Sequence, residues 1–333
     1  MKDLWKKISI RVLLLGMIVI LSNYLYRYTT YEKDIAENSP LWLEFQNAVA
    51  EADVIYFSSS PNAAYSDIYD DDNRSISKMV DDDLNDLKVI SVDTGAIHAD
   101  IFKTLIRRIP ESSPVNSVVV HLNYRSFGAG WMYSNLESSI QKQAVFYHDR
   151  PAIINRFLLG LNHYDVLSEK EGKRKMDHLW ETEELPFEFP RNTVENWCKL
   201  DKWGGYGTPE RTLADSYIKN FAFVLDEENP RIQDFDEIVE LCNEKNLDLI
   251  FVLLPENLEQ AEELVGKELI QLMTTNKNWL VDRYEGSGVT VIDNFSLLPD
   301  SSFLERDFPS EHYYDEGRQA IAQSIVNYFK QRN

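Results

Sequence analysis

Cysteine is scarce in this chain. Its 333 residues include two cysteines, Cys198 and Cys242, so a framework of several disulfides is excluded. One bridge between them is possible if the protein lies outside the cytoplasm, and two buried thiols are the alternative. No set of His, Cys and Asp has the spacing of a zinc site, and neither a P-loop nor a dinucleotide-binding fingerprint occurs. The sequence therefore predicts no metal and no cofactor.

Positive charge is scarce as well, because 34 Lys and Arg stand against 55 Asp and Glu, for a formal net charge of −21. Binding to nucleic acid depends on neutralising phosphates with Lys and Arg, so this balance predicts no nucleic-acid partner without a local basic patch. Glycine and proline are not in excess, and 44% of the residues are hydrophobic. Disordered and fibrous classes are excluded, and the length suffices for a full core in one large domain or two small ones.

The amino terminus combines a basic flank with an apolar segment. Lys2, Lys6 and Lys7 precede residues 8–26, which are mostly apolar. If Arg11 extends its charge towards the membrane surface, these 19 residues approach the ~20 that a membrane-spanning helix needs. A basic flank followed by an apolar segment is typical of an export signal or a membrane anchor.

The end of this segment favours an anchor. No cleavage site of small residues follows it, and its last residues include Tyr24 and Tyr26, which suit a membrane–water interface. The sequence predicts a cytoplasmic tip and an uncleaved transmembrane helix within residues 1–28, with a buried core helix as the alternative. Because basic flanks stay in the cytoplasm, residues 29–333 are predicted to lie outside it, in the periplasm or at the cell surface.

Five short apolar segments are rich in β-branched residues and are continuous rather than alternating. Strands of this kind have both faces buried, and the helical patterns between them imply a parallel sheet with helices on both sides. We therefore expect an α/β fold with three αβα layers, flavodoxin-like, around a five-stranded parallel sheet. The predicted strands are 54–57, 88–93, 118–123, 248–255 and 289–293.

Helical patterns account for most of the remaining chain. Helices are predicted at 40–52, 76–87, 96–109, 232–244, 258–284 and 319–329. Residues 128–228, between the third and fourth strands, are too many for an ordinary crossover and are predicted to form a helical and irregular insertion. This insertion contains several tryptophans and a glycine-rich turn at 204–207.

Polar residues follow the first three predicted strands. Ser58, Ser59 and Ser60 end the first strand, Gly95 follows the second, and Asn123 follows the third. In open α/β sheets the carboxyl edge of the strands is where ligands bind, because the loops there vary over a rigid scaffold. A serine-rich turn without chemistry is the alternative reading of the first loop.

Near the carboxyl terminus, His312 lies in a polar loop, five residues before Gly317 and directly ahead of the last helical pattern. This order resembles the SGNH/GDSL hydrolase superfamily from residue 53 to the end, without the insertion. The resemblance implies that Ser60 is the nucleophile, that Gly95 and Asn123 line the oxyanion hole, and that His312 is the base. It also implies that residues 29–333 form one catalytic domain.

The chain departs from the family pattern at two positions. Ser58 replaces the glycine of the first block, and Pro309 stands where the acid of the D-x-x-H block is expected. The acid that orients the imidazole would then be Asp307, five residues before His312, or Glu311 beside it. A Ser–His dyad helped by a backbone carbonyl is the third possibility.

Residues beside these blocks carry further expectations. Tyr124 and Arg125, directly after the third strand, are predicted to flank the pocket and bind a carboxylate or phosphate of the substrate; a surface ion pair is the alternative for Arg125. His98 and His121 are expected to be packing or surface histidines.

An amino-terminal anchor with an extracytoplasmic SGNH-like domain resembles proteins that modify cell-envelope polymers, namely the D-alanyl transfer and alginate acetylation proteins. The resemblance implies an esterase or O-acyltransferase that forms an acyl or acetyl ester on Ser60 and passes it to water or to a hydroxyl of a cell-surface glycan. It also implies a membrane-bound O-acyltransferase as partner. The alternative is a noncatalytic relative that binds a glycan or a partner of an envelope-modification system.

Overall fold

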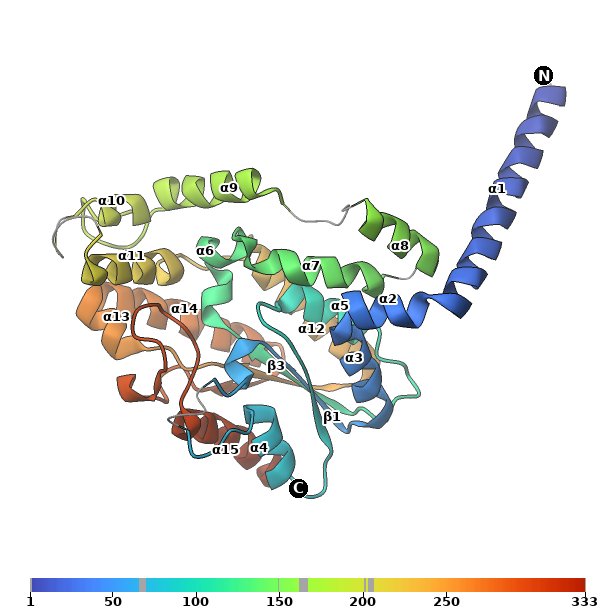
Figure 1. Cartoon of the computed structure of the whole chain (residues 1–333). Helices are drawn as coiled ribbons and strands as arrows, with labels where there is room; N and C mark the ends of the chain where they lie inside the picture. The colour runs from blue at the N-terminus through green and yellow to red at the C-terminus, as the bar shows by residue number, and fades with distance from the viewer. Residues whose placement is uncertain are drawn as a thin grey trace. The chain divides into compact units, whose positions relative to one another are not determined.

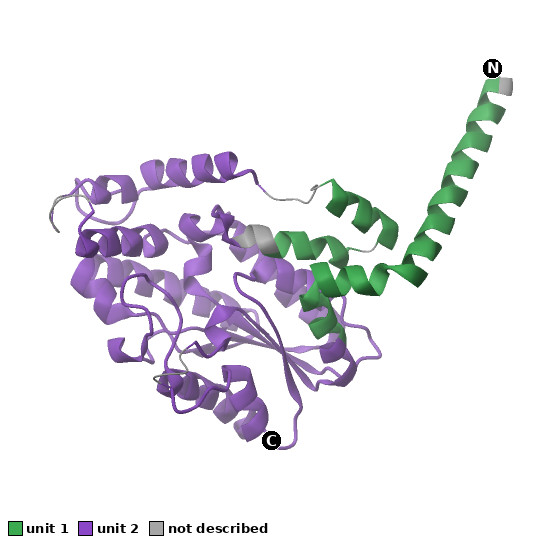
Figure 2. Cartoon of the chain, in the orientation of Figure 1, with its two compact units in different colours: residues 1–46, 138–166 green, residues 47–137, 167–333 purple. Residues whose placement is uncertain are grey.

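The computed structural model describes residues 2–65, 70–148, 150–161, 167–200, 202 and 207–332. The glycine-rich turn predicted at 204–207 lies outside the described residues, except for Gly207. The chain divides into two compact units, shown in separate colours in Figure 2. Unit 1 comprises residues 1–46 and 138–166, and unit 2 comprises residues 47–137 and 167–333.

Unit 2 contains a parallel sheet of five strands in the order β2-β1-β3-β4-β5. The strands are β1 (Val54–Ser58), β2 (Val89–Asp93), β3 (Ser117–Leu122), β4 (Asp248–Leu253) and β5 (Thr290–Asp293). Every residue of β1 and β3 is buried, as expected for the centre of a sheet covered on both faces. The order is that of a flavodoxin-like doubly wound fold, so the predicted fold class and all five predicted strands are confirmed.

Helices cover both faces of this sheet (Figure 1). On one face, Val54 and Tyr56 of β1 join a core cluster with side chains of α4 (Ile76–Asp83) and α15 (Asp315–Arg332). On the other face, Phe57 of β1 packs on Phe102 with ring centroids 5.6 Å apart. The helices of this second layer are α5 (Ala99–Arg107), α12 (Pro230–Lys245) and α14 (Lys267–Gly286).

The chain between β3 and β4 is largely helical in its described residues. It forms α6 (Ala129–Met132), α7 (Ser138–Ala144), α8 (Ala152–Gly160), α9 (Glu169–Thr182), α10 (Val194–Cys198) and α11 (Pro209–Phe221) before α12. One helix prediction is wrong, because residues 258–284 form two helices, α13 (Leu258–Leu264) and α14, rather than one. Gly266 separates them with a left-handed φ of 129°, which a continuing α-helix does not accommodate.

Unit 1 is built from the amino-terminal helices together with α7 and α8. The amino-terminal helices are α1 (Lys2–Thr29), α2 (Tyr31–Asn38) and the first part of α3 (Pro40–Glu51). Residues 4–29 of α1 form a helix long and apolar enough to cross a membrane, and their apolar stretch is exposed. Trp42 of α3 stacks on Tyr147, with ring centroids 5.6 Å apart, which joins the two stretches of chain.

The two cysteines are free thiols. Cys242 is buried in α12 and Cys198 is partly buried at the end of α10. Burial raises the pKa of both thiols to about 12. The structure therefore supports the alternative of two unpaired thiols over the disulfide.

A buried arginine of α15 holds the loop before α4. Arg318 is fully buried, and its Nη1 donates to Asp70 Oδ2 at 2.9 Å and to the Tyr313 carbonyl oxygen at 2.8 Å. The other guanidinium nitrogens donate to the carbonyl oxygens of Asp72 and Arg74. One side chain thus joins the loop that follows β1 to the start of the last helix.

We predict that Arg318→Ala lowers the free energy of unfolding by about 3–5 kcal/mol, because it leaves the Asp70 carboxylate buried without its partner. The control is Gln319→Ala, since Gln319 is the exposed neighbour on α15. Urea unfolding of the full chain in detergent, followed by near-ultraviolet circular dichroism, measures both variants. Equal midpoints for the two variants would contradict the prediction.

Candidate active site

Ser60 lies where the central strand β1 leaves the sheet. After Ser58 the chain enters the 3-10 turn Ser60–Asn62, and Pro61 fixes the backbone of its first turn. Asn62 holds this turn in place. It accepts a hydrogen bond from the Ser77 backbone N–H at 2.8 Å, and its amide group donates to Asp93 at the end of β2. The first loop is therefore fixed to both α4 and the neighbouring strand.

Tyr65 connects Ser60 with His312. The Tyr65 hydroxyl is hydrogen-bonded to the Ser60 side chain, and its ring lies against the His312 imidazole with centroids 4.2 Å apart. Burial raises the pKa of Tyr65, and the Ser60 hydrogen bond opposes part of that shift. The predicted serine and histidine are thus brought to one place, with a tyrosine that the sequence analysis did not identify in contact with both.

The carboxylate that contacts His312 is Glu305, whose Oε1 lies 2.8 Å from the imidazole Nδ1. The two acids proposed from the sequence lie elsewhere, because Glu311 is buried and paired with Arg125, and Asp307 is exposed. Burial disfavours the charge of Glu305, but hydrogen bonds from His312 and Ser310 outweigh it and hold its pKa below the usual value.

The fold of the loop explains why Glu305 meets His312. Phe303 and Tyr313 form an antiparallel bridge, and the Leu304 N–H donates to the His312 carbonyl oxygen at 3.0 Å. This register places Glu305 beside His312, although seven residues separate them in the sequence. The D-x-x-H pattern places the acid three residues before the histidine, so it does not point to Glu305. Only the expectation of a short hairpin around the Phe303–Tyr313 bridge could have indicated this contact from the sequence.

A buried ion pair attaches the histidine loop to the end of β3. Arg125 Nη2 donates to Glu311 Oε2 at 2.6 Å, and Nη1 donates to the Pro309 carbonyl oxygen. The guanidinium also lies over the Trp131 ring, 4.8 Å from its centroid. The predictions of substrate binding and of a surface ion pair both fail for Arg125, because its side chain is buried and these partners engage it.

Tyr124 is likewise buried, and its hydroxyl accepts a hydrogen bond from the Asn276 amide at 2.9 Å. Its ring packs among Phe223 and Phe295, with centroids 5.0 and 5.4 Å away. The geometry therefore assigns Tyr124 to the core of unit 2 instead of to substrate binding.

A second buried carboxyl lies near the Arg125–Glu311 pair. Glu256 follows β4, and its pKa is raised well above the usual value, first by burial and then by the negative charge of Glu311. Arg125 opposes this shift. One guanidinium therefore lies near two carboxyl groups, and burial together with the charge of Glu311 favours the protonated form of Glu256.

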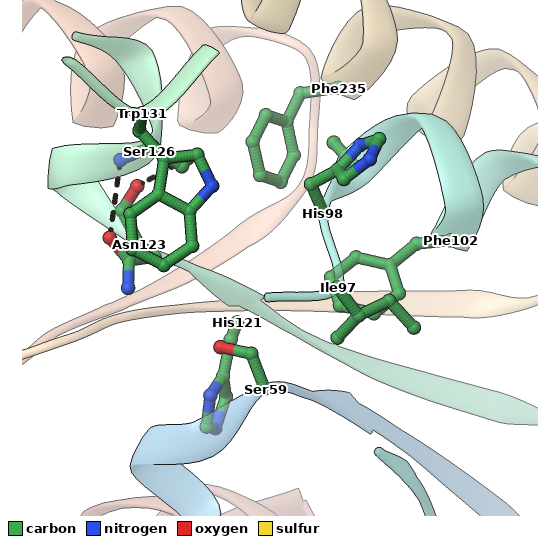
Figure 3. Close-up of a pocket in the computed structure, with 10 residues that line it drawn as sticks. Ser59, Ile97, His98, Phe102, His121, Asn123, Ser126, Trp131 and Phe235 are labelled. Atoms are coloured by element: carbon green, nitrogen blue, oxygen red, sulfur yellow. Dashed lines mark hydrogen bonds between the residues drawn. The ribbon is translucent and has the colours of Figure 1, made fainter. Parts of the chain in front are cut away.

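Asn123 borders a small buried cavity of about 10 Å³, shown in Figure 3, which is about the size of one water. Its Oδ1 accepts from the Ser126 N–H at 3.2 Å, whereas its Nδ2 is buried and has no partner within the part of the chain that the structure describes. In Figure 3 this nitrogen points away from Ser126, on the side where Ser59 and His121 lie. The free donor fits the predicted oxyanion role of Asn123.

The loop after β2 differs in detail from the expectation. Gly95 is exposed, and the left-handed residue of the turn is Ala96, with φ 61°. An alanine in this region costs about 1–2 kcal/mol. Helix α5 begins at Ala99, three residues later than predicted. The turn after β2 therefore lies where the sequence analysis placed it, with its left-handed residue one position after Gly95.

The two other histidines that the sequence analysis considered are buried. His121 Nε2 lies 2.6 Å from the Tyr56 hydroxyl, and burial lowers the pKa of His121 to about 3. His98 Nδ1 lies 2.7 Å from Arg231 Nη1, and burial lowers the pKa of His98 well below its usual value. Both rings are therefore neutral at pH 7. Among the described residues, no group of three His, Cys, Asp or Glu could hold a metal ion.

Comparison with known proteins yields distant likenesses. No family model and no curated protein matches the chain. A lipase/acylhydrolase from Enterococcus faecalis is 12% identical, with a TM-score of 0.38 over 85% of this chain and 97% of that chain. A GDSL-like lipase from Bacteroides thetaiotaomicron is 8% identical, with a TM-score of 0.36 over 91% of this chain and 98% of that chain. At such low scores the likeness carries no argument about activity, which rests on the side chains of the site.

We predict that Glu305→Gln lowers the rate at which Ser60 reacts with an ester or a fluorophosphonate by about 10²- to 10⁴-fold, because the imidazole loses the carboxylate that orients it. Asp307→Asn is the matched control and should leave the rate unchanged. Fluorophosphonate labelling of the full chain, stopped at successive times, measures the rate for each variant. A loss confined to Asp307→Asn would restore the assignment made from the sequence.

Because the pKa of Glu256 is raised, we predict that Glu256→Gln becomes more stable relative to wild type as pH rises. Wild type must keep a proton on Glu256 in the folded state, so it loses stability as pH rises above the unfolded pKa, whereas the glutamine variant does not. The difference in the free energy of unfolding between variant and wild type should grow as pH rises above the unfolded-state pKa of ~4.3, by at most ~1.4 kcal/mol per pH unit. Urea unfolding at several pH values measures it, and Glu259→Gln, at an exposed position, should show no such growth.

Proposed function

We propose that this protein is a serine esterase or O-acyltransferase that works through an acyl-Ser60 intermediate. The observation that carries the proposal is the His312–Glu305 pair, held in contact with the tyrosine that bonds Ser60. A histidine oriented by a carboxylate beside a serine is the arrangement that activates a hydroxyl as a nucleophile. The position of Ser60 at the carboxyl edge of the sheet adds to this, because ligands bind there in doubly wound folds.

In the proposed reaction, His312 takes the Ser60 proton while the serine oxygen attacks the ester carbonyl. Glu305 stabilises the imidazolium that forms, and it holds the ring through Nδ1. The tetrahedral intermediate collapses as the bond to the leaving alcohol breaks, and His312 returns the proton to that alcohol. Water or an acceptor hydroxyl then attacks the acyl-Ser60 ester by the same steps in reverse.

The developing oxyanion needs donors that have no other partner. The Asn123 Nδ2 group is such a donor, because it is buried and unpaired among the described residues. The exposed backbone at Gly95 supplies a second candidate. Tyr65 must leave the contact with Ser60 and His312 before an ester can enter. Its side chain is 48% exposed, so it can rotate into solvent.

The proposed setting is the outer face of a cell membrane. Helix α1 would act as an uncleaved anchor, with residues 29–333 in the periplasm or at the cell surface. Its length, apolar character and basic amino end support this arrangement. The acceptor would then be a hydroxyl of a cell-surface glycan or polymer, and a membrane-bound O-acyltransferase would be the partner that supplies acyl groups.

A noncatalytic binding protein is the second candidate, and one contact favours it. Tyr65 bonds Ser60 and lies against the His312 ring, so it occupies contacts of both residues that an incoming ester would need. A protein that only binds a glycan or a partner of an envelope-modification system tolerates this arrangement without any movement of Tyr65.

Labelling with a fluorophosphonate tests the two candidates on the full chain in detergent. We expect wild type to be labelled, and Ser60→Ala and His312→Ala to lose labelling, since the first removes the nucleophile and the second its base. Ser59→Ala is the matched control in the same loop and should keep it. Labelling that persists in Ser60→Ala, or fails in folded wild type, would count against the esterase and favour the binding protein.

A further inference from the structure

Helix α8 is apolar on nearly all sides and yet exposed. Its sequence, AIINRFLLG, contains one charged residue, Arg156. The buried stripe of α8 consists of Ala152, Asn155 and Leu159. On another side, Phe157 and Leu161 are 63% and 60% exposed. A four-residue spacing places these two side chains on one face, so unit 1 presents an apolar patch that water does not favour.

The start of α8 is attached to the end of α1. The Ile153 N–H at the start of α8 donates to the Asn23 side chain of α1 at 3.1 Å. Arg156 lies 3.2 Å from Asp34 of α2, and Asp34 accepts from the Tyr26 hydroxyl at 2.9 Å. These contacts all lie within unit 1. They fix α8 to the last turns of the helix that has the length and composition of a membrane span.

The position of Asn23 along α1 indicates what covers the apolar face formed by Phe157 and Leu161. Asn23 lies six residues before Thr29, the end of the apolar helix, which is about 9 Å along the axis at 1.5 Å per residue. Interfacial helices bury their apolar face about 5–10 Å into the boundary between headgroups and acyl chains. A helix attached at Asn23 therefore lies at the depth where lipid begins.

The surroundings of α8 fit a lipid interface. Tyr24 and Tyr28, on exposed positions of the same end of α1, suit the headgroup region. The single charge of α8 is positive and is neutralised by Asp34, so lipid burial of the opposite side leaves no unpaired charge behind.

We propose that α8 is a second membrane contact, which lies in the interface of the leaflet where α1 ends, with Phe157 and Leu161 inserted among the lipids. This inference rests on the proposed anchoring by α1. It gives the bilayer, rather than another protein, as the occupant of the apolar face. Two lipid contacts from one unit fix its orientation to the membrane, whereas a single helix would leave it free to turn.

Quenching by lipids tests the depth of α8 in the full chain. The variant Leu161→Cys is labelled with an environment-sensitive fluorophore in a Cys198→Ser background. The remaining native thiol, Cys242, is buried. The chain is reconstituted in phosphatidylcholine–phosphatidylglycerol vesicles that contain two nitroxide lipids, one labelled near the headgroup to reach position 161 and one labelled deep in the acyl chain to reach position 14. We expect a loss of fluorescence and a blue shift at position 161. A fluorophore at position 157 should show the same loss of fluorescence and the same blue shift.

Two reference positions make the outcomes distinct. A label at Leu14, in the middle of α1, reports the anchor, and a label at Gln46, exposed on α3, reports water. Quenching at 14 and 161 but not at 46 supports the inference. Quenching at 14 alone overturns it, leaves the anchor intact and points to a membrane protein as the occupant. No quenching at 14 overturns both, and equal quenching at 46 and 161 overturns a specific role of α8.

Discussion

The Arg125–Glu311 ion pair is the contact on which the site depends. It is buried, and it joins the turn after β3 to the loop that carries His312. Breaking such a pair costs about 3–5 kcal/mol, because one charge stays buried without its partner. Glu256 adds a second buried carboxyl to this cluster, and its raised pKa favours the neutral form. The loop that carries His312 is therefore attached to the core of unit 2 through a buried ion pair.

The strands and most core helices could be predicted because their signals are local. Continuous β-branched runs such as 54–57 and 118–123 are hydrophobic enough to be buried on both faces, and their alternation with helical patterns defines the layers. The position of Ser60, Asn123 and His312 at one sheet edge follows from the same pattern. Helix α13 ends early because Gly266 adopts a left-handed backbone. The presence of a glycine in the sequence does not show whether it will adopt this conformation.

The partners of His312 and Arg125 could not be predicted because they depend on contacts between distant residues. Glu305 reaches the imidazole through the register of the Phe303–Tyr313 bridge, whereas the sequence analysis relied on a fixed spacing and considered Asp307. Arg125 meets Glu311 across 186 residues of chain. A polar side chain beside a predicted pocket looks like a ligand-binding group until its buried partner is known.

The contact between α1 and α8 has a consequence for the order of synthesis. Asn23 and Ile153 are 130 residues apart, so α1 emerges from the ribosome long before its packing partner exists. During that interval Asn23 and the rest of the face that later meets α8 are without their packing partner. Unit 1 can close only after the whole β1–β3 segment has been made. Synthesis of the first helix and completion of its unit are thus separate events in the life of the nascent chain.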